Sequence, residues 1–181
     1  MTTKNRQKPY ILSALLIALC VVIGYIFLYV PNVELLTASV FVSGYLVGPL
    51  FGLATGLFAE LIFSLFNPLG APIPSLLLAQ TVSMALIGAA GGLYRRRAFD
   101  KKMSWPGVVQ LAVTGFMLTL LFDVLTTLSF AILMAGTDVK KLLSTFVYGM
   151  SFYAIHLFCN TVVFAMLVPL LISRMRSHVV S

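Results

Sequence analysis

Long apolar stretches fill most of this 181-residue chain, and its charged residues lie almost entirely outside them. Charged residues make up 9% of the sequence, against roughly a quarter in a soluble domain, so a soluble globular fold is excluded. About 20 apolar residues cross a bilayer as one helix. We therefore expect residues 1–181 to form a single all-α integral membrane domain with six transmembrane helices. The six stretches are 10–30, 35–48, 50–66, 73–94, 107–135 and 142–173.

The positive residues predict how these helices are oriented. Ten of the 12 Lys and Arg residues precede the first stretch, follow the fourth or follow the sixth, and the other two are Lys140 and Lys141. With six spans all ten lie on one face, which the positive-inside rule assigns to the cytoplasm. Both termini are then cytoplasmic, with an N-terminal tail over 1–9, a basic loop over 95–105 and a C-terminal tail over 174–181. This orientation accounts for the net charge of +7 without nucleic acid as a partner.

Glycines indicate where the helices approach one another. Gly48-Pro49 divides residues 35–66, and a single span there would move the basic loop to the outside, so we expect two short helices with a cytoplasmic turn. Small residues at every fourth position allow close helix packing in lipid. The glycines with this spacing are Gly44, Gly48, Gly52 and Gly56, followed later by Gly88 and Gly92.

The first helix carries a separate small-residue pair, Ala14 and Ala18, among leucines. Two alternatives stay open for it. The pair forms either a contact within the chain or a docking groove for the helix of another protein.

Ionisable residues at membrane depth are costly and indicate function. At about 1.5 Å per residue from the outer helix ends, Glu60 and Gln80 lie about 10 Å deep, whereas Asp123 and His156 lie about 20 Å deep. Glu60 has no basic partner in its layer, so we expect it to be protonated, matched to a cationic ligand or hydrated. Asp123 and His156 are expected to join two helices, with Asn160 as a further structural residue.

Polar and aromatic side chains share helix faces near the outer ends, as expected for a concave ligand site. The residues predicted to contact the ligand are Glu60, Phe63, Asn67, Gln80, Thr127, Phe130, Tyr148 and Phe152.

Sequence motifs of enzymes are absent. The chain has no G-x-x-x-x-G-K-[ST] phosphate loop, no H-E-x-x-H and no G-x-S-x-G. We expect no catalytic residue, cofactor or metal, and a transport function. Two alternatives remain: a self-sufficient carrier or proton-coupled transporter using Glu60 and Asp123, and an intramembrane enzyme using Asp123 and His156.

Several short motifs resemble those of the substrate-binding S components of energy-coupling factor (ECF) vitamin transporters. The resemblance extends over nearly the whole chain. It rests on six helices in a short chain and on the Ala14 and Ala18 pair, Pro31-Asn32-Val33, Gly48-Pro49, the segment Asn67-Pro68-Leu69-Gly70-Ala71-Pro72, and Gln80 ahead of Gly88-Ala89-Ala90-Gly91-Gly92.

This resemblance implies a multi-pass protein of a bacterial or archaeal cell membrane, surrounded by lipid, that binds a vitamin or related micronutrient in an outward-facing cavity. Outer loops 31–34, 67–74 and 136–141 help to line the cavity in such a protein. Ala14 and Ala18 would dock onto a membrane coupling subunit that carries two ATPase subunits. Many relatives have tryptophans before the position of Gln80, where this chain has Pro72-Ile73-Pro74-Ser75, so their ligand class is not carried over.

Overall fold

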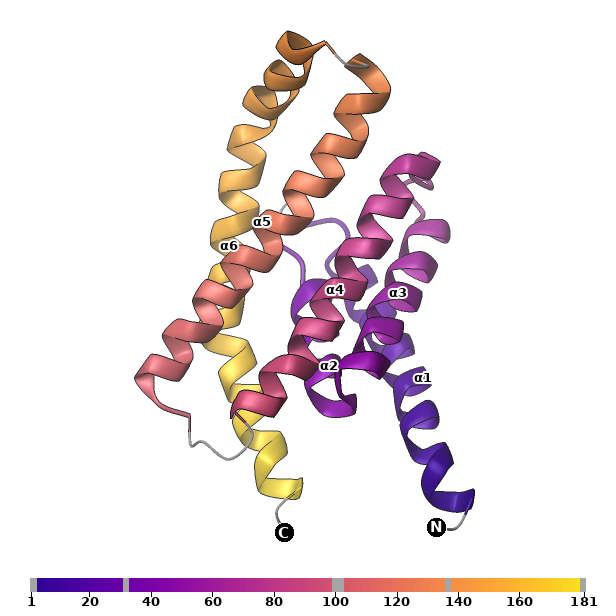
Figure 1. Cartoon of the computed structure of the whole chain (residues 1–181), viewed down its shortest axis with the longest axis vertical. Coiled ribbons are helices and arrows are strands. Elements are labelled where there is room, and N and C mark those ends of the chain that lie inside the picture. The colour runs from indigo at the N-terminus through magenta and orange to yellow at the C-terminus, as the bar shows by residue number, and fades with distance from the viewer. Residues whose placement is uncertain (1–2, 31–32, 99–102, 136–137, 180–181) are drawn as a thin grey trace.

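The structure, a computed structural model, describes residues 3–30, 33–98, 103–135 and 138–179, and these contain six helices and no strand. The all-α prediction is therefore confirmed, with one helix for each apolar stretch. Segments 31–32, 99–102 and 136–137, which belong to the expected loops, lie outside the described residues. The helices are α1 (Thr3–Ile26), α2 (Leu36–Val47), α3 (Pro49–Leu65), α4 (Pro74–Ala98), α5 (Trp105–Ala135) and α6 (Val139–Val179), drawn in Figure 1.

The basic segments are more helical than we expected. The predicted tail 1–9 belongs to α1 from Thr3 onward, and the predicted tail 174–181 belongs to α6 as far as Val179. The first part of the predicted loop 95–105 is the last turn of α4, which contains three arginines. Lys and Arg are good helix formers, and positive charge is favourable at a helix C-terminus, so a helix does not need to end where the apolar stretch ends.

Four helices are long and apolar enough to cross a membrane, namely α1, α4, α5 and α6. The other two are shorter, with 12 residues in α2 and 17 in α3. At about 1.5 Å per residue they measure about 18 and 26 Å, below the roughly 30 Å of a hydrocarbon core. Six full-length spans are therefore not confirmed, and the number of crossings rests on how the α2–α3 pair is placed.

Glycines let α2, α3 and α4 pack backbone against backbone, which confirms the role predicted for the four-residue spacing. A Cβ atom added to Gly44 or Gly52 would overlap the carbonyl oxygen of Gly88, and one added to Gly88 would overlap the carbonyl oxygen of Gly52. One added to Gly92 would overlap the backbone at Gly48. These three helices therefore form a closely packed unit.

The turn between α2 and α3 lies at the same end of the molecule as the arginines of α4. Gly48 has a φ of 90°, in the left-handed region that favours glycine, and Pro49 follows it at the start of α3. Arg95 donates a hydrogen bond from Nη1 to the carbonyl oxygen of Leu46 at 2.6 Å. Figure 1 shows both chain termini at this end, which we call the basic end.

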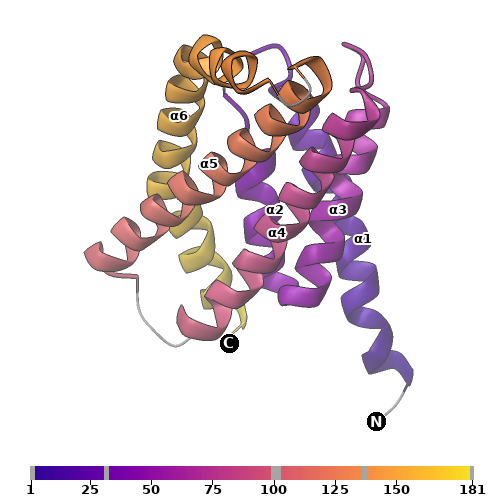
Figure 2. The same cartoon turned by 45° about the horizontal axis from the view of Figure 1, so that its top comes forward.

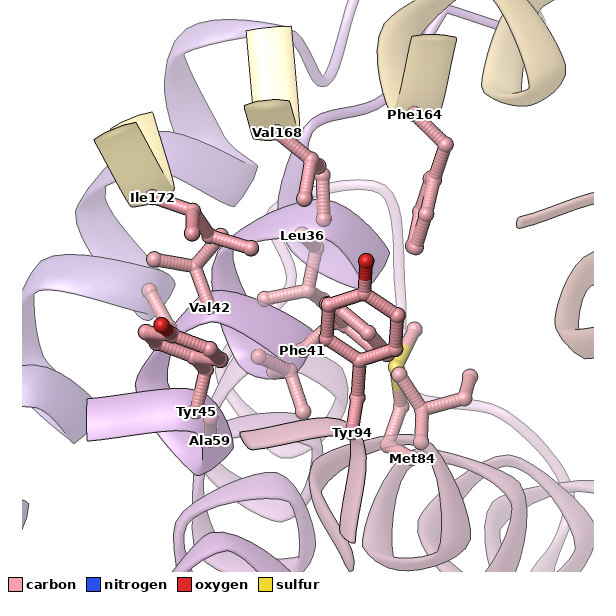
Figure 3. Packing of buried hydrophobic residues seen from close by; sticks show 14 of the residues in the cluster. Leu36, Phe41, Val42, Tyr45, Ala59, Met84, Tyr94, Phe164, Val168 and Ile172 are labelled. Carbon is pink, nitrogen blue, oxygen red and sulfur yellow. The ribbon is translucent and has the colours of Figure 1, made fainter. Parts of the chain in front are cut away.

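The helix α2 occupies the middle of the bundle, with nine of its residues buried. In Figures 1 and 2, α1 and α3 lie on one side of α2 and α4, and α5 and α6 lie on the other. Side chains of α6 reach α2, as Figure 3 shows, and the rings of Phe41 and Phe164 are 5.2 Å apart between centroids. The ring of Phe41 also lies 5.8 Å from that of Tyr94. The core therefore joins all sides of the bundle through α2.

Candidate ligand-binding site

A cavity of about 320 Å³ lies toward the end of the bundle opposite the basic end. It is lined by residues of all six helices and of the connection between α1 and α2. This volume is within the range of about 300–1,000 Å³ that small-molecule sites occupy. The lining residues are Gly24, Phe27, Leu28, Val30, Val33, Glu34, Leu36, Thr37, Glu60, Phe63, Gln80, Met84, Phe122, Phe152 and His156.

Four of the eight residues predicted to contact the ligand line this cavity: Glu60, Phe63, Gln80 and Phe152. The spacing of three residues in α3 places Glu60 and Phe63 on one face. Glu60 is only 2% exposed, and its Oε1 accepts a hydrogen bond from Ser64 Oγ at 2.7 Å. A buried carboxylate and aromatic rings therefore face the same space.

Gln80 gives the cavity an unused hydrogen-bond acceptor. Its Oε1 atom is buried and has no hydrogen-bond partner among the described residues. Leaving such an atom unpaired costs about 1–3 kcal/mol. A ligand that donates a hydrogen bond to Gln80 would recover part of that cost.

The other four predicted ligand residues lie elsewhere. Thr127 and Phe130 line a second cavity of about 280 Å³ between α5 and α6, together with Phe152. There the Thr127 hydroxyl is 2.6 Å from the hydroxyl of Tyr153. Tyr148 is 86% exposed and lines neither cavity, so its position does not support ligand contact. Asn67 lies after α3, where its Oδ1 accepts the backbone N–H of Leu69.

Asp123 and His156 are joined by a hydrogen bond of 2.8 Å between Oδ1 and Nδ1. Asn160, one turn further along α6, lies with its Nδ2 atom 3.1 Å from His156 Nε2. However, His156 also lines the main cavity, so it does not belong to a layer separate from Glu60 and Gln80. The two predicted layers came from measuring the depth of each residue from the outer end of its own helix. Those ends are not level, because α5 and α6 extend well beyond the outer ends of α3 and α4 (Figure 1).

Glu34 is a charged lining residue that was not among the predicted ligand contacts. Its Oε1 accepts a hydrogen bond from Asn160 Nδ2 at 2.9 Å and lies 3.8 Å from His156 Nε2. Its Oε2 accepts the backbone N–H of Thr37 at 2.9 Å, near the start of α2. The only signal in the sequence was its place in an outer connection of the type that lines the cavity in S components.

The hydrogen-bond partners of Glu34 also affect its ionisation. Burial acts to raise the pKa of the Glu34 carboxyl, but the His156 ring and the Thr37 N–H oppose this effect and lower the pKa below its ordinary value. Glu34 is therefore ionised at neutral pH. Its charge lies at the cavity wall, within the connection from α1 to α2.

Ala14 and Ala18 are both exposed on α1, and so is Leu15 between them. This exposure favours the alternative of a docking surface over that of a contact within the chain. Two small side chains on an exposed helix face allow the backbone of another helix to approach closely.

The cavity has the properties of a binding site. Its aromatic walls can contact a flat molecule, and a few polar groups can orient it. No group of three His, Cys, Asp or Glu side chains within the described ranges is arranged to hold a metal ion.

Comparison with known proteins assigns the family. Residues 8–175 match the family described as ECF transporter, substrate-specific component, which is a transporter component and not an enzyme family. No curated protein and no solved structure matches the chain. The family and the apolar helices make this a multi-pass membrane protein that binds a small-molecule substrate and works with an ECF module. The chain therefore belongs to the family of substrate-specific components, or S components, of ECF transporters.

Proposed function

We propose that this S component captures a vitamin or related micronutrient and delivers it through a membrane coupling subunit powered by two separate ATPase subunits. The observation that carries the proposal is the cavity of about 320 Å³ that contains Glu60 and Gln80. The sequence has no phosphate-loop motif, so in this proposal ATP is hydrolysed by partner subunits. The host is a bacterium or archaeon, and the protein lies in its cell membrane.

In this proposal the cavity opens to the outside and the basic end faces the cytoplasm. The α2–α3 pair then crosses as two short helices, which gives six crossings and cytoplasmic termini. The support is the concentration of Lys and Arg at the basic end, where Arg95, Arg96 and Arg97 end α4. The close packing of α2 on α3 and α4 supports the crossing of two short helices, because it removes α2 from contact with lipid.

The proposed docking surface for the coupling subunit consists of Ala14 and Ala18. Both are exposed, and their small side chains allow the backbone of a partner helix to approach closely. This surface lies on α1, and neither alanine lines the cavity. Docking and ligand binding can therefore be tested separately.

The proposal is tested by purifying the protein and identifying retained small molecules by mass spectrometry. The identified molecule is then offered to vesicles that contain the protein with its coupling subunit and both ATPases. We expect the vesicles to take up the molecule only when ATP is present on the side of the membrane where the ATPase subunits lie. Uptake by the protein alone, dependent on Glu60 and Asp123, would instead establish a self-sufficient carrier. Chemical conversion of the molecule that depends on Asp123 and His156 would establish an intramembrane enzyme.

A further inference from the structure

The main cavity is lined by more acidic than basic side chains. Its charged lining residues are Glu34, Glu60 and His156, and there is no Lys or Arg among the described lining residues. When His156 is protonated, its charge is offset by Asp123, whose Oδ1 lies 2.8 Å from His156 Nδ1. The Glu34 carboxylate, together with that of Glu60 when it is ionised, then leaves an excess of negative charge at the cavity.

Glu60 has no counter-charge within the described residues. It is 2% exposed, and the hydrogen bond that it accepts comes from the neutral hydroxyl of Ser64 at 2.7 Å. An ionised carboxylate in such a place is costly unless a positive group pairs with it. A cation bound in the cavity would supply that group, and the low dielectric would strengthen the attraction.

Three hydrogen-bonding groups at the cavity also favour a cation. The Glu34 and Glu60 carboxylates are acceptors, and the buried Oε1 of Gln80 is an acceptor with no partner among the described residues. A ligand with N–H groups would satisfy acceptors of this kind. An anionic ligand would bring further acceptors and would be repelled by both carboxylates.

Aromatic rings form much of the remaining wall. They are contributed by four helices or their connections: Phe27, Phe63, Phe122 and Phe152. The faces of such rings attract cations within about 6 Å of the ring centroid. The volume of about 320 Å³ is near the lower end of small-molecule sites, so it suits a compact molecule with a ring.

We propose that the ligand is a compact organic cation, in which an apolar or aromatic ring carries a positively charged nitrogen, held by Glu60, Glu34 and the acceptor of Gln80. This inference rests on the proposed function, because it names the charge class of the same ligand. In this proposal the Glu60 carboxylate makes a cation bind more tightly than a neutral molecule of the same shape.

The first test uses three probes of one ring each that differ in charge: benzylammonium, benzyl alcohol and benzoate. Binding to the full-length protein in nanodiscs is measured by calorimetry at millimolar concentrations. We expect benzylammonium to bind at least about tenfold more tightly than the other two, a difference of about 1.4 kcal/mol. Equal binding of the three, tighter binding of benzoate or no binding of benzylammonium would overturn the proposal.

Matched variants locate the charge effect. Glu60→Gln should reduce benzylammonium binding about tenfold and leave that of benzyl alcohol unchanged. Asp138→Asn, which removes the same charge from an exposed position that does not line the cavity, should leave both unchanged. An equal loss of both probes in Glu60→Gln would show a change in cavity shape and would overturn the role assigned to its charge.

The second test determines the charge at neutral pH of the molecule retained by the purified protein. A cation supports the proposal. A neutral or anionic molecule that is still taken up with the coupling subunit and ATPases would overturn the charge class and leave the transport function standing. A cation that is retained but not taken up would support the charge class and contradict the transport function.

Discussion

Asp123 of α5 and His156 of α6 form a buried hydrogen bond of 2.8 Å between Oδ1 and Nδ1. The rings of Phe122 and Phe152 each lie 6.3 Å from the His156 ring between centroids. The pair therefore fixes the position of an imidazole ring that also forms part of the cavity wall. Stability of the α5–α6 pair and the shape of the cavity depend on the same bond.

Asp123→Ala should destabilise the empty protein, because it leaves the buried Nδ1 atom of His156 without its hydrogen-bond partner. The expected loss is about 3 kcal/mol, as for breaking other buried pairs. The measurement is the thermal unfolding midpoint in detergent without ligand. Val124→Ala, at the exposed neighbouring position, should change the midpoint little. Equal midpoints for Asp123→Ala and the native protein would show that the bond does not stabilise the helix pair.

Gln80→Ala should weaken ligand binding by about 1–3 kcal/mol, the range for losing a buried polar partner. The stability of the empty protein should change little, since the Gln80 Oε1 atom has no partner to lose within the described structure. Calorimetry with the retained molecule measures the affinity. Asn67→Ala is the matched amide control outside the cavity and should retain native affinity. If Gln80→Ala bound the ligand with native affinity, Gln80 of α4 would not be part of the binding site.

Ala14→Trp with Ala18→Trp should abolish uptake while ligand binding survives. The bulky side chains would keep a partner helix away from α1, and neither residue lines the cavity. Transport is measured in cells, and binding is measured with the purified variant. Ala154→Trp makes the same kind of substitution once, at an exposed position of α6, and should transport normally. Normal uptake by the α1 variant would exclude this surface as the docking site.

Gly88→Ala should destabilise the bundle by about 2 kcal/mol or more, because the new methyl group would overlap the carbonyl oxygen of Gly52. The Gly52 carbonyl group is part of the helix backbone, so the overlap can be relieved only if α3 and α4 move apart. Gly107→Ala is the control, since the nearest atom to its added Cβ would be the Met103 sulfur at 3.3 Å, on a flexible side chain. Thermal unfolding of both variants is compared. Similar midpoints would mean that α3 and α4 can separate at little cost.

Single cysteines at Leu69 and Arg97 should react with an impermeant thiol reagent from opposite sides of the membrane. Leu69 lies between α3 and α4, and Arg97 lies in the last turn of α4. Both are exposed, so access to the reagent depends on the side of the membrane and not on burial. The background variant replaces Cys20 and Cys159 with alanine. Labelling of both positions from one side would exclude the proposed orientation.

The number and order of the helices follow from the apolar stretches, because in lipid each backbone N–H and C=O group must be satisfied within a helix. The positions at which the helices end were harder to predict from the sequence. The helix α1 begins at Thr3, within a basic segment, since nothing in the chemistry of Lys or Arg stops a helix at the membrane surface. The lengths of α2 and α3 show a related limit, because Gly48-Pro49 marks their boundary but not how deeply they lie.

The cavity lining was predictable where residues are close along the chain or on neighbouring helices, as for Glu60, Phe63 and Gln80. The place of Glu34 was not, because its contact with Asn160 joins positions 126 residues apart. Tyr148 lies outside the cavity for a different reason. Its four-residue spacing from Phe152 describes one face of α6, but α6 extends beyond the cavity, so the same face is exposed further along.

The hydrogen bond from Asn160 to Glu34 has a consequence for the biosynthesis of the protein. The ribosome completes the segment with Glu34, Glu60 and Gln80 long before it reaches α6. Until α6 is inserted, the Glu34 carboxylate has neither Asn160 nor His156 beside it, and one wall of the cavity does not exist. The nascent chain therefore carries most of its recognition groups early but acquires a closed binding site only with its last helix.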